Sequence, residues 1–202
     1  GADANANATF PFLSFAHGTF VIEPYTDYRT VLETVASYGF VVVAPKSCPA
    51  TECFKYYKDQ LATIAACRAD PSLHPALATA DFSATGVFGH SMGGMATIMS
   101  AEHHDAYNLK AAVAMHACWE LELNPKAVDV PILYTAGSAD RVCPDGCAAS
   151  FYGETPGDKT YLDIKGQSHF EPTDAGNNCE ATAIALFLAC KLRGENCDKV
   201  DN

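Results

Sequence analysis

Residues 86–94 read GVFGHSMGG and contain the pattern Gly-x-Ser-x-Gly, with Ser91 at its centre. A β-like apolar run, residues 85–88, precedes the pattern, and a helix-like run of small and apolar residues, 94–101, follows it. The flanking glycines permit a strained turn that joins a strand directly to a helix and presents the serine hydroxyl at its tip. Alone the pattern is common by chance, but in this context it predicts a nucleophilic serine on such a turn.

The rest of the chain alternates strand-like and helix-like segments. Alternation of this kind implies right-handed crossovers, and therefore a mostly parallel central sheet with helices on both faces. Ligands of such sheets bind beyond the carboxyl ends of the strands, where Ser91 falls. Strands are predicted at 10–16, 40–44, 85–88, 109–115, 131–136 and 159–164, and helices at 27–37, 55–69, 94–101 and 179–192.

The composition limits the class of protein and its partners. With 49% hydrophobic and 18% charged residues, the chain is expected to be globular and to form a single domain over residues 1–202. Residues 1–9 are expected to be a flexible N-terminal segment, and their small, polar start suggests a processed or trimmed terminus. No apolar run approaches membrane-spanning length. The net charge of −11 argues against nucleic acid and membranes as partners and is compatible with a neutral substrate.

Nine cysteines are many for a chain of this length. Several lie beside Pro, Gly or Asn, and no pair has the C-x₂-C spacing of most zinc sites, so disulfides are expected and a metal is not. Disulfides indicate an oxidising compartment and favour secretion, which the sequon at residues 7–9 fits. The odd count requires at least one free thiol or an intermolecular bond, and Cys118, in an apolar run, is the candidate for the free thiol.

A serine hydroxyl needs a histidine base, and the base needs a carboxylate that fixes its tautomer. With a serine on this kind of turn, the chain order is serine, acid, histidine. Asp140 follows the strand at 131–136 and is predicted to be the acid, with Asp145, in a Pro-Asp-Gly turn, as the less favoured alternative. His169 follows the last strand and is the one histidine of seven that satisfies both order and position. His116, near another strand end, is a candidate for lining the cleft.

Two backbone N–H groups are predicted to form an oxyanion hole. One is that of Met92, the residue after the serine. The other comes from the loop after the first strand, where Thr19 is preferred and Phe20 is the alternative. His90 lies inside the turn but is expected to point away from Ser91.

Taken together, these residues resemble the α/β-hydrolase superfamily, from Phe10 to Leu192. The runs GHSMGG at 89–94 and YGFVV at 38–42 are similar to segments of bacterial cutinases and polyester (PET) hydrolases. The segment that begins at Leu109 is similar to the strand that ends at the substrate-stacking tryptophan of those enzymes, although one residue more separates Lys110 from its tryptophan.

The resemblance implies an α/β-hydrolase fold. The lid is expected to be minimal or absent, because the only candidate for a lid is the brief segment 119–129. The expected cleft is therefore open, and Trp119 is as well explained by core packing as by substrate contact. Thr19 falls where those enzymes carry an oxyanion-loop tyrosine, and the two early strands of the full fold are missing. The residues expected to contact the substrate are Phe20, Trp119, Val142 and Phe170.

The predicted function is that of a serine carboxylic-ester hydrolase that works through an acyl-enzyme. The open cleft favours short-chain esters or a polyester such as cutin or PET, and the reaction needs no cofactor and no metal. We expect a monomer whose partner is an ester substrate, either a small molecule or a polymer surface. The alternatives are a non-catalytic ligand-binding protein of this fold, since a fold does not fix a function, and a chlorophyllase- or thioesterase-type enzyme.

Overall fold

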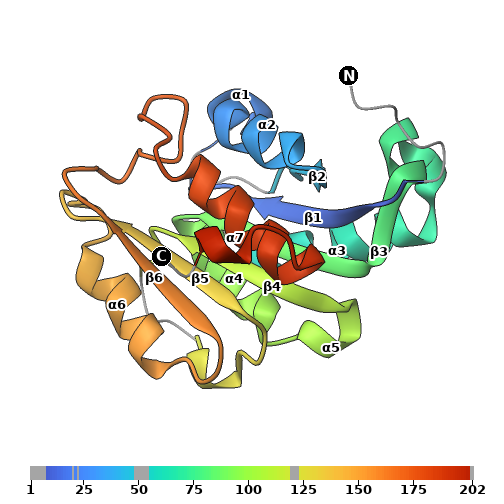
Figure 1. Cartoon of the computed structure of the whole chain (residues 1–202). Helices are drawn as coiled ribbons and strands as arrows, with labels where there is room; N and C mark the ends of the chain where they lie inside the picture. Colours follow the sequence, from blue (N-terminus) through green and yellow to red (C-terminus); the bar gives the residue numbers. More distant parts are fainter. Residues whose placement is uncertain (1–7, 20, 22, 48–54, 119–122, 201–202) are drawn as a thin grey trace.

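The computed structural model describes residues 8–19, 21, 23–47, 55–118 and 123–200. A six-stranded sheet runs through its centre in the order β2-β1-β3-β4-β5-β6 (Figure 1). All of its neighbouring strands pair in parallel, which confirms the predicted parallel sheet. The strands are β1 Phe10–Ala16, β2 Val41–Val43, β3 Ala80–His90, β4 Leu109–Met115, β5 Ile132–Gly137 and β6 Lys159–Ile164.

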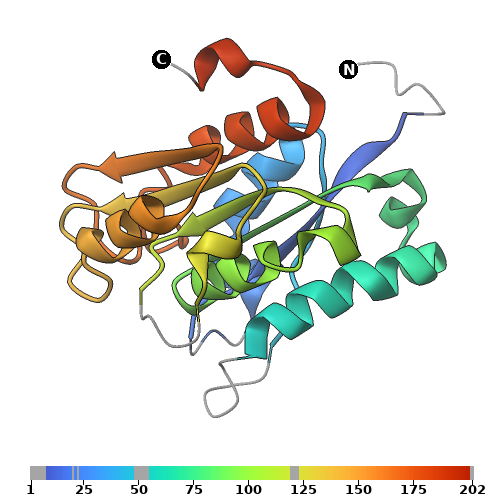
Figure 2. The same ribbon diagram turned by 90° about the horizontal axis from the view of Figure 1, so that it is seen from below.

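Helices cover both faces of the sheet, as predicted (Figure 2). On one face, α2 (Arg29–Ser37) and α7 (Ala181–Arg193) enclose one apolar core. On the other, α3 (Tyr56–Ala69), α4 (Met92–Ala101) and α6 (Asp145–Glu154) enclose a second. The shorter helical elements are α1 Pro24–Asp27, η2 Pro71–Leu73, η3 Pro75–Thr79, α5 His104–Tyr107, η4 Pro125–Ala127 and η5 Cys197–Lys199.

Two elements differ most from the sequence prediction. Strand β3 extends over Ala80–His90 instead of 85–88, because its first residues also pair with β1 across an irregularity in register. Helix α6 was not predicted, since Gly146 and Gly153 are poor helix formers. It forms because Ala148 and Phe151 are buried on its inner side.

One buried glutamine connects the elements that lie beneath Ser91. The Gln60 amide in α3 donates to the carbonyl of Ser14 in β1 (3.1 Å) and to that of Phe88 in β3 (3.0 Å). Its oxygen accepts from the hydroxyl of Ser100 in α4 (2.7 Å). A fully buried amide stabilises a fold only when such partners satisfy it, so these bonds fix α3 and α4 against the central strands.

The predicted disulfides are present, but the assignment of Cys118 as a free thiol is wrong. Cys118 lies beyond the end of β4, where it reaches α6 and pairs with Cys147. The second disulfide joins Cys190 in α7 to Cys197. Among the cysteines that the structure describes, Cys67, Cys143 and Cys179 are free.

Two further expectations concern the chain ends and the membrane. Most of the segment expected to be flexible, residues 1–7, lies outside the described residues. In the part of the chain that the structure covers, no helix has both the length and the apolarity needed to cross a bilayer.

Removing the Cys118–Cys147 disulfide should destabilise the fold more than removing Cys190–Cys197. The two bonds close loops with sequence separations of 29 and 7 residues. Loop-closure entropy then gives about 3.5 kcal/mol for the first and about 2.3 kcal/mol for the second. Urea unfolding of the two double-alanine variants measures this difference, and an equal or reversed order would contradict it.

Candidate active site

The predicted site residues meet at one edge of the sheet because each follows a parallel strand. Ser91 follows β3, Asp140 comes three residues after the end of β5, and His169 lies in the loop after β6. Since the strands run in the same direction, their carboxyl ends and the loops that follow lie at the same edge.

Ser91 occupies the strained turn that the sequence predicted. Its φ of 57° and ψ of −119° are unfavourable for a residue with a side chain, and its N–H donates to the Met115 carbonyl at 2.9 Å. Close backbone contacts explain the glycines, because a Cβ on Gly93 would collide with the backbone of Ala16 in β1. A Cβ on Gly89 would in turn collide with the backbone of Gly93.

A continuous hydrogen-bonded chain joins the three predicted residues. His169 Nε2 lies 2.9 Å from Ser91 Oγ, and His169 Nδ1 lies 2.8 Å from Asp140 Oδ2. An ionised carboxylate can only accept, so Nδ1 carries a proton and a neutral His169 presents Nε2 as the acceptor for the serine hydroxyl. This is the tautomer that a general base requires.

The Asp140 carboxylate accepts hydrogen bonds at both oxygens. Oδ1 accepts from the backbone N–H groups of Val142 (2.8 Å) and Cys143 (2.7 Å), and Oδ2 accepts from His169 and from His116 Nδ1 (3.0 Å). Burial by itself raises the pKa of Asp140, but the bonds from His116, His169 and Cys143 outweigh burial and hold that pKa well below its usual range. Asp140 is therefore an anion at neutral pH.

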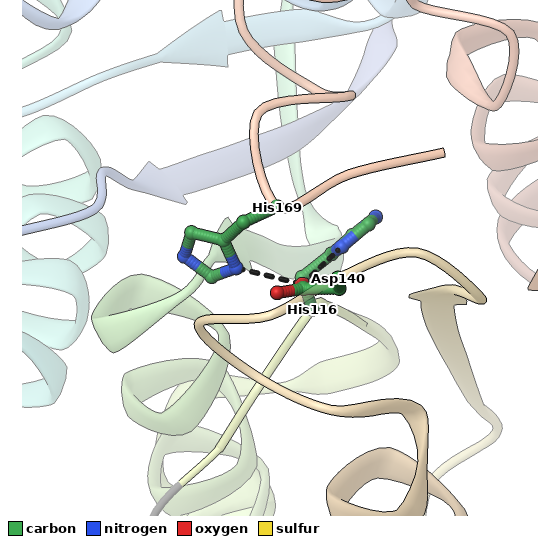
Figure 3. A group of neighbouring side chains, drawn as sticks. All are labelled: His116, Asp140 and His169. Carbon is green, nitrogen blue, oxygen red and sulfur yellow. Dashed lines mark hydrogen bonds and ion pairs between the residues drawn. The ribbon is translucent and has the colours of Figure 1, made fainter. Parts of the chain in front are cut away.

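His116 lies behind Asp140, so the expectation that it lines the cleft is wrong. Its side chain is completely buried, and its ring lies on the opposite side of Asp140 from the ring of His169 (Figure 3). Its Nε2 faces Glu180 Oε1 at 3.4 Å, an ion-pair distance, and Glu180 is equally buried. Burial lowers the pKa of His116, but the hydrogen bond to Asp140 and the charges of Asp140 and Glu180 prevail and raise it to about 9.

A second chain of hydrogen bonds connects the loop after β1 to the loop that carries His169. The Gly18 N–H donates to the Tyr28 hydroxyl (3.0 Å), which lies 2.7 Å from His90 Nδ1. His90 Nε2 in turn donates to the His169 carbonyl at 2.8 Å. Burial, followed by the charges of the neighbouring histidines, lowers the pKa of His90, so it is neutral and its Nδ1 accepts a hydrogen bond from the Tyr28 hydroxyl. His90 points away from Ser91, as expected, and supports His169 instead.

The predicted oxyanion donors lie where the loop after β1 approaches the turn at Ser91. Helix α4 begins at Met92, and the N–H groups in the first turn of a helix have no partner within the helix. Gly18, the residue before Thr19, is so close that a Cβ on it would lie 3.5 Å from the Ser91 Cβ. Phe20, the alternative donor, lies outside the described residues.

Of the predicted substrate contacts, Val142 and Phe170 are exposed, at 49% and 56%. The Phe170 ring lies edge-on to that of His169, with the ring centroids 5.8 Å apart. Trp119, like Phe20, lies outside the described residues. Asp145, the alternative acid, lies at the start of α6 and is exposed, bonded to the N–H of Gly146.

A metal ion and a cysteine nucleophile are the two other chemistries that the residues at this place suggest. The possible ligand atoms of His116, Asp140 and His169 lie within 4.8 Å of one another, a spacing that could hold a metal ion. However, both histidines direct Nδ1 at the same carboxylate oxygen, so an ion there would have to replace these hydrogen bonds (Figure 3). The neighbouring thiol of Cys143 is no rival nucleophile, because burial raises its pKa to about 12 and keeps it protonated.

Comparison with known proteins identifies the family. Residues 15–190 match the family described as "PETase: PET hydrolase-like". The chain belongs to this family. The match, together with the parallel sheet and its two helical layers, confirms the predicted α/β-hydrolase fold.

Individual relatives agree with the family assignment. The chain is 29% identical over 171 residues to Cutinase 1 of Thermobifida cellulosilytica, which covers 81% of this chain and 64% of that protein. It is 30% identical over 182 residues to Cutinase 2 of the same organism, with 85% and 68% covered. It is also 32% identical over 116 residues to the bis(hydroxyethyl) terephthalate hydrolase of Streptomyces coelicolor, with 56% and 35% covered. The chain thus spans less than two thirds of the length of several of these relatives, and 56% of a cutinase from Thermobifida fusca.

The sequence did not predict the buried residues that support the hydrogen-bonded chain from Ser91 to Asp140. Tyr28 was assigned to a helix face, and Glu180 lies within a predicted helix without any pattern that marks it. For His116 the one signal was its position near the end of a predicted strand, which suggested the cleft and not the back of Asp140.

The raised pKa of His116 predicts a stability that decreases at alkaline pH. The ordinary value is 6.5 and the folded value about 9, so the protonated form stabilises the fold fully below pH 6.5. That contribution is lost as the pH rises through about 9 and amounts to on the order of 3 kcal/mol. Urea unfolding at several pH values should show wild type losing more stability over this range than His116→Gln. The exposed His103→Gln serves as the control, and parallel curves for wild type and His116→Gln would contradict the assignment.

Proposed function

We propose that this protein is a serine carboxylic-ester hydrolase that acts through an acyl-enzyme. The observation that carries the proposal is the hydrogen-bonded chain from Ser91 through His169 to Asp140, on a strained turn at the carboxyl edge of the sheet. Membership of the PET hydrolase-like family supports it, because relatives of this chain are named cutinases. We also propose that the chain acts as a single domain.

In the first half of the proposed reaction, Ser91 Oγ attacks the ester carbonyl while His169 Nε2 takes the hydroxyl proton. The negative charge that develops on the carbonyl oxygen is stabilised by the N–H groups of Met92 and Thr19. Asp140 stabilises the imidazolium and holds its Nδ1–H in place. His169 then donates its proton to the leaving alcohol, and the acyl group remains on Ser91.

In the second half, water attacks the acyl-enzyme and His169 takes a proton from that water. The tetrahedral intermediate collapses with Ser91 Oγ as the leaving group, and His169 returns the proton to it. The products are a carboxylic acid and free enzyme, so no metal or cofactor is needed to balance the reaction.

The substrate class is proposed from the exposed apolar side chains beside the site. Val142 and Phe170 present apolar surface in the loops that carry Asp140 and His169. Such a surface suits a short acyl group or a segment of a polyester, and one relative is named as a hydrolase of a terephthalate ester. Phe20 and Trp119 are further proposed contacts.

We propose that the protein is secreted and monomeric, and that neither nucleic acid nor a membrane is a partner. Two disulfides fit an oxidising compartment. The net charge of −11 disfavours binding to polyanions.

The proposed activity predicts hydrolysis of p-nitrophenyl esters that depends on Ser91. Rates with acetate, butyrate, octanoate and palmitate esters should decrease with acyl length, because the exposed apolar side chains offer no enclosed site for a long chain. Ser91→Ala should retain the fold and lose on the order of 10⁴-fold or more in kcat. Full activity of purified Ser91→Ala would refute the assignment, and a preference for palmitate would refute the substrate class.

Ser83→Ala, at an exposed serine, is the matched control for the effect of replacing a serine with alanine. Ser83 lies in β3 and its hydroxyl donates to the nearby Asp81, so removal of this hydroxyl should leave the rates unchanged. A film of polyester added to the panel tests the polymer substrate directly.

A further inference from the structure

Two buried ionisable residues extend the hydrogen-bonded chain beyond Asp140. His116 follows β4 directly, and Glu180 is the residue before α7, so they come from distant parts of the sequence. Neither has a role in the proposed chemistry, and burying both charges is costly unless they are paired. Their pairing at the back of Asp140 therefore calls for a functional explanation.

The backbone at His116 has a positive φ, which is uncommon for a residue with a side chain. Among the described residues that are not glycine, five have positive φ: Ser91, Asn108, His116, Asn178 and Asn196. Three of these are asparagine, which adopts this conformation readily, and the other two residues held in this sparsely populated region are Ser91 and His116 (φ 47°). A conformation of this kind persists where the surroundings fix it.

The surroundings of His116 do fix its ring. Its N–H donates to the Thr135 carbonyl at 2.9 Å, which holds the backbone against β5. Gly137 packs so closely that a Cβ on it would lie 3.1 Å from His116 Cε1. The ring is thereby directed at Asp140 Oδ2, the oxygen that also accepts from His169 (Figure 3).

Titratable side chains face His116 from several elements. Asp140 lies 3.0 Å from Nδ1 and Glu180 lies 3.4 Å from Nε2, while the rings of His169 and His90 lie at centroid distances of 6.0 and 5.8 Å. His90 is neutral, because burial lowers its pKa. A protonated His116 therefore balances Glu180, and the charge of Asp140 remains available to His169.

We propose that His116 and Glu180 form a positioning pair that sets the pH range in which His169 acts as a base. As a cation, His116 fixes Asp140 Oδ2 and opposes the second positive charge that forms when His169 takes a proton. Glu180 offsets that charge and so reduces the opposition, whereas the bond to Asp140 suffices to hold the proton on His116. The inference rests on the proposed function for its catalytic meaning, but the electrostatic pair itself is testable without turnover.

The two partners have opposite effects on His169, and this gives a specific test. His116→Gln removes a cation and retains an amide that can donate to Asp140, so the imidazolium of His169 becomes easier to form. Glu180→Gln replaces an anion with a neutral amide of nearly the same shape, so the imidazolium of His169 becomes harder to form. A charge 6.0 Å away in a protein interior changes the titration midpoint of a histidine by about one to two pH units.

Histidine ring NMR titration measures these midpoints. We expect the His169 midpoint to rise in His116→Gln and to fall in Glu180→Gln, with an intermediate value in the double variant. The His116 resonance should titrate well above pH 7 in wild type and at lower pH in Glu180→Gln. The control His103→Gln should leave both midpoints unchanged.

The outcomes separate this inference from the proposed function. Midpoints of His169 that move in the same direction in both variants, or in neither, would overturn the pair, because a purely structural role does not predict opposite signs. If the midpoints move as expected but wild type hydrolyses no ester, the pair stands and the proposed function fails. In an active enzyme, the acidic limb of kcat/KM should move with the midpoint in each variant. A limb that does not move would show that the pair does not tune the base.

Discussion

A contact between two backbones determines how the site can be built. Gly93, in the first turn of α4, lies so close to the end of β1 that a Cβ would collide with the Ala16 backbone. This contact holds α4 against the sheet and forces Ser91 into its strained conformation directly after β3. The loop that begins at His17 is brought to the same point, next to the first free N–H groups of α4. One steric constraint thus brings a serine hydroxyl and the proposed oxyanion donors together.

Hydrogen bonds then fix the remaining side chains around that point. Asp140 is held by two backbone N–H groups and two imidazoles, which leaves its carboxylate a single orientation. His169 is held from the other side, through the bond from His90 to its carbonyl. The Tyr28 hydroxyl continues this second chain to Gly18, so the loops after β1 and β6 are connected beneath Ser91. Preorganised dipoles of this kind cost nothing to reorient during a reaction.

The sequence predicted the parts of the site that depend on chain order, and missed those that depend on side-chain packing. Ser91, Asp140 and His169 were predictable because each follows a strand, and parallel strands end at one edge. His116 and Glu180 were not, because nothing in a one-dimensional pattern shows that a residue after β4 and one before α7 meet behind Asp140. The disulfide of Cys118 was missed for a similar reason. Its partner lies in α6, a helix that the sequence did not predict because it contains two glycines. Most of the six strands were predicted because their runs of apolar residues are typical of buried strands in a parallel sheet.

The central claim is that Ser91 is a nucleophile activated by His169 and Asp140. Labelling with a fluorophosphonate probe, followed by mass spectrometry of the peptides, tests it most directly because the probe reports the nucleophile itself and needs no choice of substrate. The account predicts one stoichiometric adduct on Ser91, formed at least 100-fold more slowly when Asp140 is replaced by Asn, because the base would then hold the wrong tautomer. An unlabelled Ser91 in folded protein, or an adduct on another residue, would contradict the account.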